Sequence, residues 1–327
     1  MHNSKSKAFS LIELSIVILI IGILVAGITQ SSRLVTQMKL SSARSLTTSS
    51  PVSSIKGLAL WLEPTLEDSF ASNESEDAAA ITVWNDTNPQ TTQPLYAVAQ
   101  TGTVADPKAN PHTPPATNPV DIAYEDNAIN GLPAVNFTSS ATTYSPGKRL
   151  TLSTTYVSGA ANYFLFTNVN NTVPPVTSSK STTFIVYKKT ATTNAPRTLL
   201  WNGATKTEGW GYEEITGGFR QFSSTTPSVG TVAMATIPEI ATMTINGTGA
   251  APSVYINGSG AGIAGVSTIL TPATGFFIGN ANALGTPATP FVGYIAEVIV
   301  YDGVLKDSDR KSVEAYLGKK YGIKVTT

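Results

Sequence analysis

The sequence contains no cysteine and only two histidines among its 327 residues. Without cysteine there is no disulfide framework, no thiolate nucleophile and no Cys-ligated zinc site. The two histidines, His2 and His112, lie near the N-terminus and in a proline-rich stretch. They leave little basis for His-dependent acid–base catalysis or a His-ligated metal.

Charged residues are also scarce, because they make up 13% of the chain, about half of the usual share. The 21 basic residues balance the 21 acidic residues, so we expect no nucleic-acid partner. Serine, threonine, asparagine, glycine and alanine fill the gap, a bias that is common in exported β-rich proteins. The length allows one large domain or two ordinary ones with a sizeable core.

A long apolar run lies close to the N-terminus, with no charged residue between Glu13 and Arg33. At about 1.5 Å per residue, this run is long enough to cross the roughly 30 Å hydrocarbon core of a bilayer. Helix-like spacing of apolar residues continues beyond it, and we expect the helix to end near Thr48 because Pro51 follows.

Glu13 is the unusual residue of this run. A carboxylate within a membrane helix costs on the order of 2.5–3.5 kcal/mol at the bilayer centre and therefore needs a partner. Cleavage between Ala8 and Phe9 would create an α-amino group about one helical turn from the carboxylate. Because both groups lie near the same end of one helix, we expect Glu13 of one copy to neutralise the Phe9 amine of a neighbouring copy.

The stretch Phe9-Ser-Leu-Ile-Glu-Leu14 behind a basic leader resembles the prepilin signal of type IV pilins and type II secretion pseudopilins. The resemblance implies cleavage before Phe9 by a prepilin peptidase, N-methylation of Phe9, and assembly with other pilin or pseudopilin subunits through Glu13. The residue before the cut is usually Gly in that family, whereas this sequence has Ala8.

Two other interpretations remain open at this point. A secretory signal peptide would use Lys5 and Lys7 as its basic region, but it gives Glu13 no role and needs a cut near Ala26 or Gly27. A plain signal anchor is the second. We expect a bacterial inner-membrane precursor with its N-terminus in the cytoplasm and its C-terminal domain extracytoplasmic, which reaches a pilus, a pseudopilus or the cell surface after assembly.

From Gly57 onward, short alternating or apolar runs separated by Asn-Gly and Asp-Gly turn signals predict antiparallel hairpins in an all-β sandwich. A short C-terminal helix should follow, capped by Asp307 or Ser308. The turn signals begin at Asn130, Asn202, Asn246, Asn257 and Asp302. An apolar stripe on the helix, expected to pack on the sheet, comprises Val313, Tyr316, Leu317 and Tyr321. The predicted layout is a leader (1–8), a transmembrane assembly helix (9–50), a linker (51–56) and a β domain (57–327).

Within that domain, Gly57-Leu-Ala-Leu-Trp-Leu62, Asn130–Phe137 and Phe291–Gly322 look like the laminin-G-like, concanavalin A-like jelly rolls of bacterial surface proteins. The resemblance covers about residues 57–322 and implies a jelly-roll sandwich that meets an extracellular glycan or protein. Glu63 stands where this group often has Asp.

Carboxylate pairs suited to glycoside hydrolysis are not apparent. Glu213 and Glu214 are adjacent and would point to opposite faces of a strand, and Glu297 has no second acid at a suitable spacing. We interpret all three as solvated or sheet-edge acids and expect that the protein is not an enzyme.

Two weaker binding sites are candidates. We expect no cofactor otherwise, but calcium could bind to oxygen-rich loops around Asp86 and Asp302. Aspartates in turns, however, already have a local structural role. Trp210 and Tyr212 could stack on a sugar ring, although a buried core position between the sheets suits such aromatic residues better.

Together these observations favour a pilin-like subunit, either a minor pilin or a pseudopilin. It would assemble through its N-terminal helix and display an adhesive jelly-roll domain. The alternative is a membrane-anchored surface lectin or glycosidase that enters no filament.

Overall fold

The computed structural model describes most of the chain, and it divides into two compact units, Met1–Ser42 and Ala43–Thr327. The predicted leader at 1–8, including Ala8, lies outside the described residues, and so does Phe9. The described residues are 11–90, 96–100, 122–137, 149–153, 180–190, 197–205, 208–215, 218–223, 228–230, 234–246, 252–261, 263–264, 276–279 and 291–326.

The first described element is the helix α1, Leu11–Thr48. Its 38 residues give it a length of ~57 Å, and its end at Thr48 confirms the boundary predicted from Pro51. The apolar side chains from Leu11 to Ile28 are exposed on every face of the helix. Within the described part of the chain, α1 is the one helix long and apolar enough to cross a bilayer.

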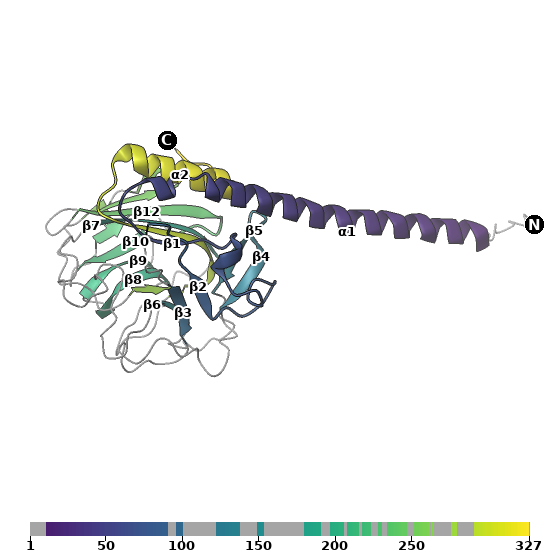
Figure 1. Cartoon of the computed structure of the whole chain (residues 1–327), viewed down its shortest axis with the longest axis horizontal. Helices are drawn as coiled ribbons and strands as arrows, with labels where there is room; N and C mark the ends of the chain where they lie inside the picture. Colours follow the sequence, from purple (N-terminus) through teal and green to yellow (C-terminus); the bar gives the residue numbers. More distant parts are fainter. Residues whose placement is uncertain are drawn as a thin grey trace, which may run out of the picture. The chain divides into compact units, whose positions relative to one another are not determined.

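Two antiparallel sheets form the second unit (Figure 1). The first sheet contains β1 beside β17 and the order β14-β13-β12-β7-β17-β5-β4. Its strands are β14 (Ser259–Gly260), β13 (Ser253–Ile256), β12 (Glu239–Asn246), β7 (Lys180–Lys189), β17 (Gly293–Asp302), β5 (Leu132–Asn136), β4 (Ala123–Ile129) and β1 (Leu58–Leu62).

The second sheet has the order β15-β11-β10-β9-β8-β16-β6-β3-β2. Its strands are β15 (Ile263–Ala264), β11 (Ser228–Gly230), β10 (Gly218–Ser223), β9 (Glu208–Ile215), β8 (Arg197–Thr205), β16 (Phe276–Ile278), β6 (Arg149–Ser153), β3 (Tyr96–Gln100) and β2 (Val83–Asn85). Two short 3-10 helices, η1 (Val52–Ser54) and η2 (Glu67–Ser69), flank β1. The predicted all-β sandwich between an N-terminal and a C-terminal helix is confirmed.

The turn signals were correct where they fall between paired strands. Asn130-Gly131 joins β4 to β5 and Asn257-Gly258 joins β13 to β14, with positive φ at all four residues as hairpin turns require. Asn202, by contrast, lies inside β8 next to a register shift. The prediction of a turn there was wrong because a following glycine also suits a β-bulge.

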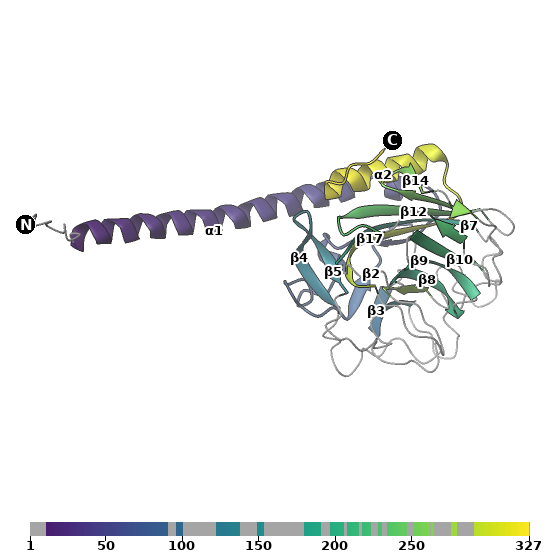
Figure 2. The same cartoon turned by 180° about the vertical axis from the view of Figure 1, so that it is seen from behind.

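The first sheet is covered on both faces, which explains why β7 and β17 are buried along almost their whole length. One face packs against the second sheet through residues such as Ile185, Val298 and Val300. The other face packs against the C-terminal helix α2, Asp307–Tyr321 (Figures 1 and 2). The predicted apolar stripe of α2 is buried there, as expected: Val313, Tyr316, Leu317 and Tyr321.

The predicted side-chain cap of α2 is wrong. Lys306 is the N-cap and no side chain caps the helix, because Asp307 is already helical and its carboxylate lies 3.6 Å from the Nε of Arg310. At the other end, Gly322 adopts the left-handed conformation and its N–H bonds to the Gly318 carbonyl, an ordinary glycine stop.

The second unit begins before the predicted linker. Ala43 and Val52 are buried in the core beneath α2, and the Tyr301 hydroxyl donates to the Val52 carbonyl at 2.9 Å. The Gln90 amide donates to the carbonyls of Ser53 and Ile55. Residues 51–56 are therefore packed against the domain: their carbonyls accept hydrogen bonds from it and the Val52 side chain is buried in it. The sequence does not reveal these contacts.

Candidate functional site

Glu13 lies in the first turn of α1, among exposed apolar neighbours. The side chains of Leu11, Ile12 and Leu14 are all more than half exposed. Next along the helix, the Ser15 hydroxyl returns a hydrogen bond to the Leu11 carbonyl at 2.8 Å, which removes its polar group from the apolar surface. A helix that is apolar on every face is stable only in lipid or among other helices.

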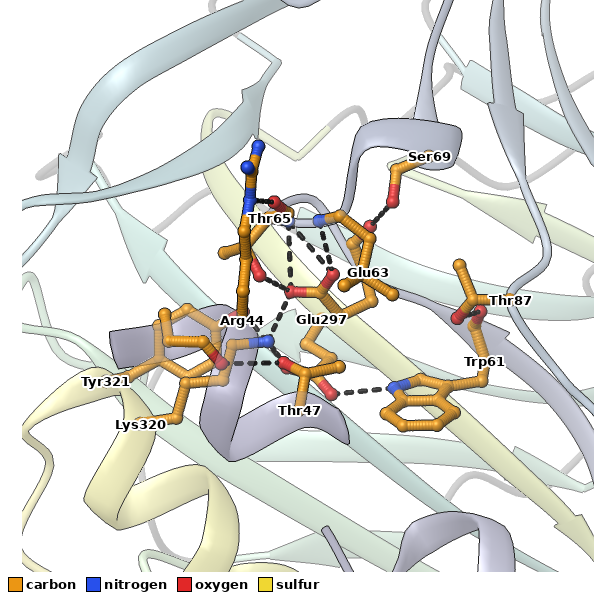
Figure 3. Close-up of polar contacts among 12 residues, drawn as sticks. Arg44, Thr47, Trp61, Glu63, Thr65, Ser69, Thr87, Glu297, Lys320 and Tyr321 are labelled. Atoms are coloured by element: carbon orange, nitrogen blue, oxygen red, sulfur yellow. Dashed lines mark hydrogen bonds and ion pairs between the residues drawn. The ribbon is translucent and has the colours of Figure 1, made fainter. Parts of the chain in front are cut away.

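The second site is a buried polar network, which we define as Trp61, Glu63, Glu297, Tyr316, Lys320 and Tyr321. Figure 3 labels all of these residues except Tyr316. Lys320 on α2 holds two carboxylates: its Nζ donates to Glu63 Oε1 and, at 2.9 Å, to Glu297 Oε2. The side chains of all three residues are 0% exposed. One buried ammonium between two buried carboxylates leaves carboxylate lone pairs that need further hydrogen-bond donors.

Those donors are present around Glu297. Its Oε1 accepts from Trp61 Nε1 at 2.7 Å and from the Tyr316 hydroxyl at 3.0 Å. Its Oε2 accepts from the Tyr321 hydroxyl at 3.0 Å in addition to Lys320. Burial, as the largest cause, raises the pKa of Glu297, and the nearby Lys320 opposes this rise.

Glu63 is held by its own chain as well as by Lys320. The backbone N–H of Thr65 donates to both carboxylate oxygens at 3.0 Å, and that of Leu66 donates to Oε2 at 2.9 Å. These fixed donors compensate a buried carboxylate. They also mean that Glu63 organises the turn that follows β1.

A β-bulge explains how Glu297 reaches α2. The register between β17 and β7 shifts between Ile295 and Glu297, so Ala296 is an extra residue. Ile295 faces the second sheet, whereas Ala296 belongs to the cluster beneath α2. Glu297 contacts α2 as well, so two successive residues point to the same face.

The network also includes the last turn of α1. The Tyr316 hydroxyl lies 3.3 Å from Thr47 Oγ1, and Arg44 donates to the Thr65 carbonyl at 2.7 Å and pairs with Glu67 at 2.7 Å. Because Thr65 also holds Glu63, the end of the helix, the turn after β1 and α2 are joined through one set of polar contacts (Figure 3).

Comparison with known families concerns the N-terminal segment. Residues 3–29 match the prokaryotic N-terminal methylation motif. This is the motif of type IV pilins and pseudopilins, and it confirms that part of the sequence resemblance. The matched range includes Glu13 and the two predicted processing positions, Ala8 and Phe9. With the apolar helix, the methylation motif indicates a membrane-inserted precursor and a pilus or surface location.

The β domain is similar to parts of solved structures. Trypanosoma rangeli sialidase bound to 2,3-difluoro-KDN is 12% identical with a TM-score of 0.46, over 84% of this chain and 34% of that chain. A botulinum neurotoxin type C structure, described as depending on two ganglioside molecules for cell entry, is 11% identical with a TM-score of 0.46, over 80% and 51%. The chain thus spans about a third to a half of the length of these structures. A comparison with curated proteins gave no match.

Such a distant likeness concerns the sandwich fold alone. The assignment to laminin-G-like domains stays a prediction, and so do the ligand and the adhesive role. The N-terminal methylation motif and the β-sandwich are therefore the two features on which a function can be built.

The structure does not bring the candidate calcium ligands together. Asp86 Oδ1 accepts from the backbone N–H groups of Trp61 and Asn88, and Asp302 lies beside Gly57. These positions are at opposite ends of β1, ~13 Å apart by the rise of a strand, so one ion would not contact both. Among the described residues, no group of three or more His, Asp or Glu side chains is arranged to hold a metal.

Trp210 and Tyr212 both lie in β9. Their side chains lie outside the described part of the structure, as do those of Glu213 and Glu214, so the stacking hypothesis stays a prediction.

The interpretation of Glu297 as a solvated or sheet-edge acid was wrong, because this residue is fully buried in a central strand. Two signals in the sequence could have indicated its burial. The residues before and after Glu297 in its strand are apolar, and Lys320 occupies a position of the apolar stripe of α2. A lysine in such a stripe needs an acid in the facing sheet.

Proposed function

We propose that the protein is a minor pilin or pseudopilin that enters a filament through α1 and carries its β-sandwich on the outside. The observation that carries this proposal is the N-terminal methylation motif at residues 3–29, continued by a helix whose apolar side chains are exposed on every face. Prepilin peptidase would process the chain, and the inner membrane would hold the precursor with its N-terminus in the cytoplasm.

Glu13 is the residue that makes assembly selective. In lipid a charged carboxylate is unfavourable by on the order of 2.5–3.5 kcal/mol at the centre and less near the interface. A neighbouring subunit displaced along the filament would bring its Phe9 amine to this carboxylate, so subunit entry would add an oppositely charged group and lower this cost. The apolar helix surface then supplies non-specific cohesion, while the ion pair sets the register.

The large second unit suits a minor or tip position, because a head of this size around every helix of a thin filament would be crowded. Its role would be adhesive, through contact with an extracellular glycan or protein. The described buried carboxylate pair, Glu63 and Glu297, is 0% exposed and cannot reach a substrate, which supports a non-enzymatic domain.

Replacement of Glu13 tests the assembly role. Glu13→Gln removes the charge with little change in volume, and we expect filament incorporation to fall at least tenfold while precursor insertion stays unchanged. Ser15→Ala is the matched control, because Ser15 is in the same exposed part of the helix and bonds only to its own backbone in the described contacts. Incorporation is measured by immunoblot of sheared filaments against the membrane fraction.

Equal incorporation of Glu13→Gln and Ser15→Ala would contradict the assembly role and favour a membrane-anchored protein that enters no filament. The non-enzymatic proposal has a separate test. The detergent-solubilised full chain is incubated with a glycan panel, and cleavage of any member would favour a membrane-anchored glycosidase, whereas binding without cleavage supports the proposed display of a binding domain.

A further inference from the structure

Lys320 and Glu63 place an amine next to a carboxylate, the two groups that an amide bond requires. Lys320 is a primary amine on α2, Glu63 is a carboxylate at the end of β1, and Nζ donates directly to Glu63 Oε1. The two residues are 257 positions apart in sequence, and both side chains are 0% exposed. This burial keeps bulk solvent away from the carboxyl carbon.

A second carboxylate lies where a proton acceptor is needed. Glu297 Oε2 accepts from Lys320 Nζ at 2.9 Å, on the same nitrogen that contacts Glu63. Burial raises the pKa of Glu297, which brings it closer to the range in which a carboxyl group both accepts and returns a proton. The hydroxyls of Tyr316 and Tyr321 and the indole of Trp61 hold it in place.

Glu63 also has donors that would stabilise a tetrahedral intermediate. The backbone N–H groups of Thr65 and Leu66 point at its carboxylate oxygens at 3.0 and 2.9 Å. Fixed backbone donors aimed at an oxygen that gains negative charge are the arrangement of an oxyanion hole. The donors around Glu297 are side chains, so the backbone-held Glu63 is the better acceptor of the amine.

We propose that Lys320 and Glu63 condense to an isopeptide bond, with Glu297 as the proton acceptor. The Lys320 ammonium gives one proton to Glu63, and Nζ attacks the Glu63 carboxyl carbon while a second proton passes to Glu297. The C–O bond of the resulting tetrahedral carbon then breaks, and Glu297 returns its proton to the departing hydroxyl group. One amide and one water molecule form, with no oxidant or other reactant.

The bond would remove two charges from a site in which desolvation opposes every charge. It would also join the residue after β1 to the C-terminal helix, close to Thr47 at the end of α1 (Figure 3). A pulling force that enters the domain through α1 would then meet a covalent tie between the first strand and the last helix. The proposal does not depend on the identity of the filament.

Peptide mapping of the full chain, purified in detergent and digested with trypsin, tests the proposal directly. Trypsin cuts after Lys56 and Lys108 and releases Glu63 in the peptide 57–108. An amide on Lys320 prevents cleavage after that residue, so Lys320 remains in the peptide 320–324. We expect one joined species of these two peptides, lighter than their sum by one water molecule.

Separate peptides 57–108 and 321–324 from folded protein would overturn the proposal. A joined species of 320–324 with 221–306, which contains Glu297, would overturn the assignment to Glu63. The folded state is checked by circular dichroism before digestion, so that an unreacted, unfolded sample does not enter the comparison.

The role of Glu297 is tested with Glu297→Gln, which keeps both reacting groups and removes the proton acceptor. We expect the joined fraction to fall at least tenfold. Glu67→Gln is the matched control, because Glu67 is a nearby exposed acid that pairs with Arg44, and it should react like the wild type. Complete joining in folded Glu297→Gln would refute the proton-transfer role.

Discussion

The substitution Lys320→Met offers the most informative perturbation of the fold. Methionine keeps an unbranched side chain of similar length and removes the ammonium that donates to Glu63 and Glu297. Two carboxylates, each 0% exposed, then lie in the core without a cation. If the native Lys320 is joined to Glu63, the substitution removes that amide as well, so both forms predict a loss of stability.

The expected magnitude follows from the burial of the pair. Removing one partner of a buried ion pair destabilises a protein by about 3–5 kcal/mol, out of a total stability of about 5–15 kcal/mol. We therefore expect the melting temperature to fall by roughly 6–20 °C. Fluorescence follows the unfolding of the second unit, because Trp61 and Trp84 are both buried there.

Two comparisons separate charge from packing. Lys319→Met makes the same chemical change at the adjacent exposed position, and it should alter stability by no more than about 0.5 kcal/mol. Adding Glu63→Gln to Lys320→Met removes one uncompensated charge, so the double variant should be more stable than the single one. Equal stability of Lys320→Met and Lys319→Met would refute the role of the network.

Two further predictions concern the hairpins and tyrosines of the β domain. Gly258→Ala should destabilise the domain by about 1–3 kcal/mol in urea unfolding, because φ is +81° and an added Cβ would collide with the Thr326 carbonyl oxygen. Gly260→Ala is the control, because an added Cβ there would have nothing within 4 Å. An equal loss of stability from both substitutions would contradict this reasoning. Burial raises the pKa of Tyr124 to about 12, so its contribution to stability is fully present below the unfolded pKa of about 10 and is lost as pH rises through about 12. As the pH rises from about 10 to about 12, the free energy of unfolding should therefore fall less in Tyr124→Phe than in the wild type. Parallel profiles of unfolding free energy against pH for the two proteins would refute the pKa shift.

Several local features of this chain were predictable, because each depends on a few neighbouring residues, although the turn expected at Asn202 and the side-chain cap expected for α2 were wrong. Pro51 places the end of α1, alternating runs give strands, and the Asn-Gly pairs at Asn130 and Asn257 give hairpin turns. The methylation motif is likewise a continuous stretch near the N-terminus. These signals need no knowledge of what lies opposite them in space.

The buried polar network was not predictable in the same way. Its acids, Glu63 and Glu297, meet Lys320 only after the first and last strands pair and α2 docks. A β-bulge then turns Glu297 toward α2, and no pattern in the neighbouring sequence predicts that bulge. The same non-local packing draws Ala43 and residues 51–56 into the second unit, which is why a linker was predicted where the chain is packed.

The mature N-terminus is the measurement closest to the central claim, that α1 is processed and assembles as a pilin helix. The protein is isolated from its native cell, and the mass of its first peptide is determined. An N-methylated Phe9, produced by cleavage after Ala8, is the expected result. A chain that still begins at Met1 would contradict the account and leave a β-sandwich held in the membrane by an unprocessed anchor.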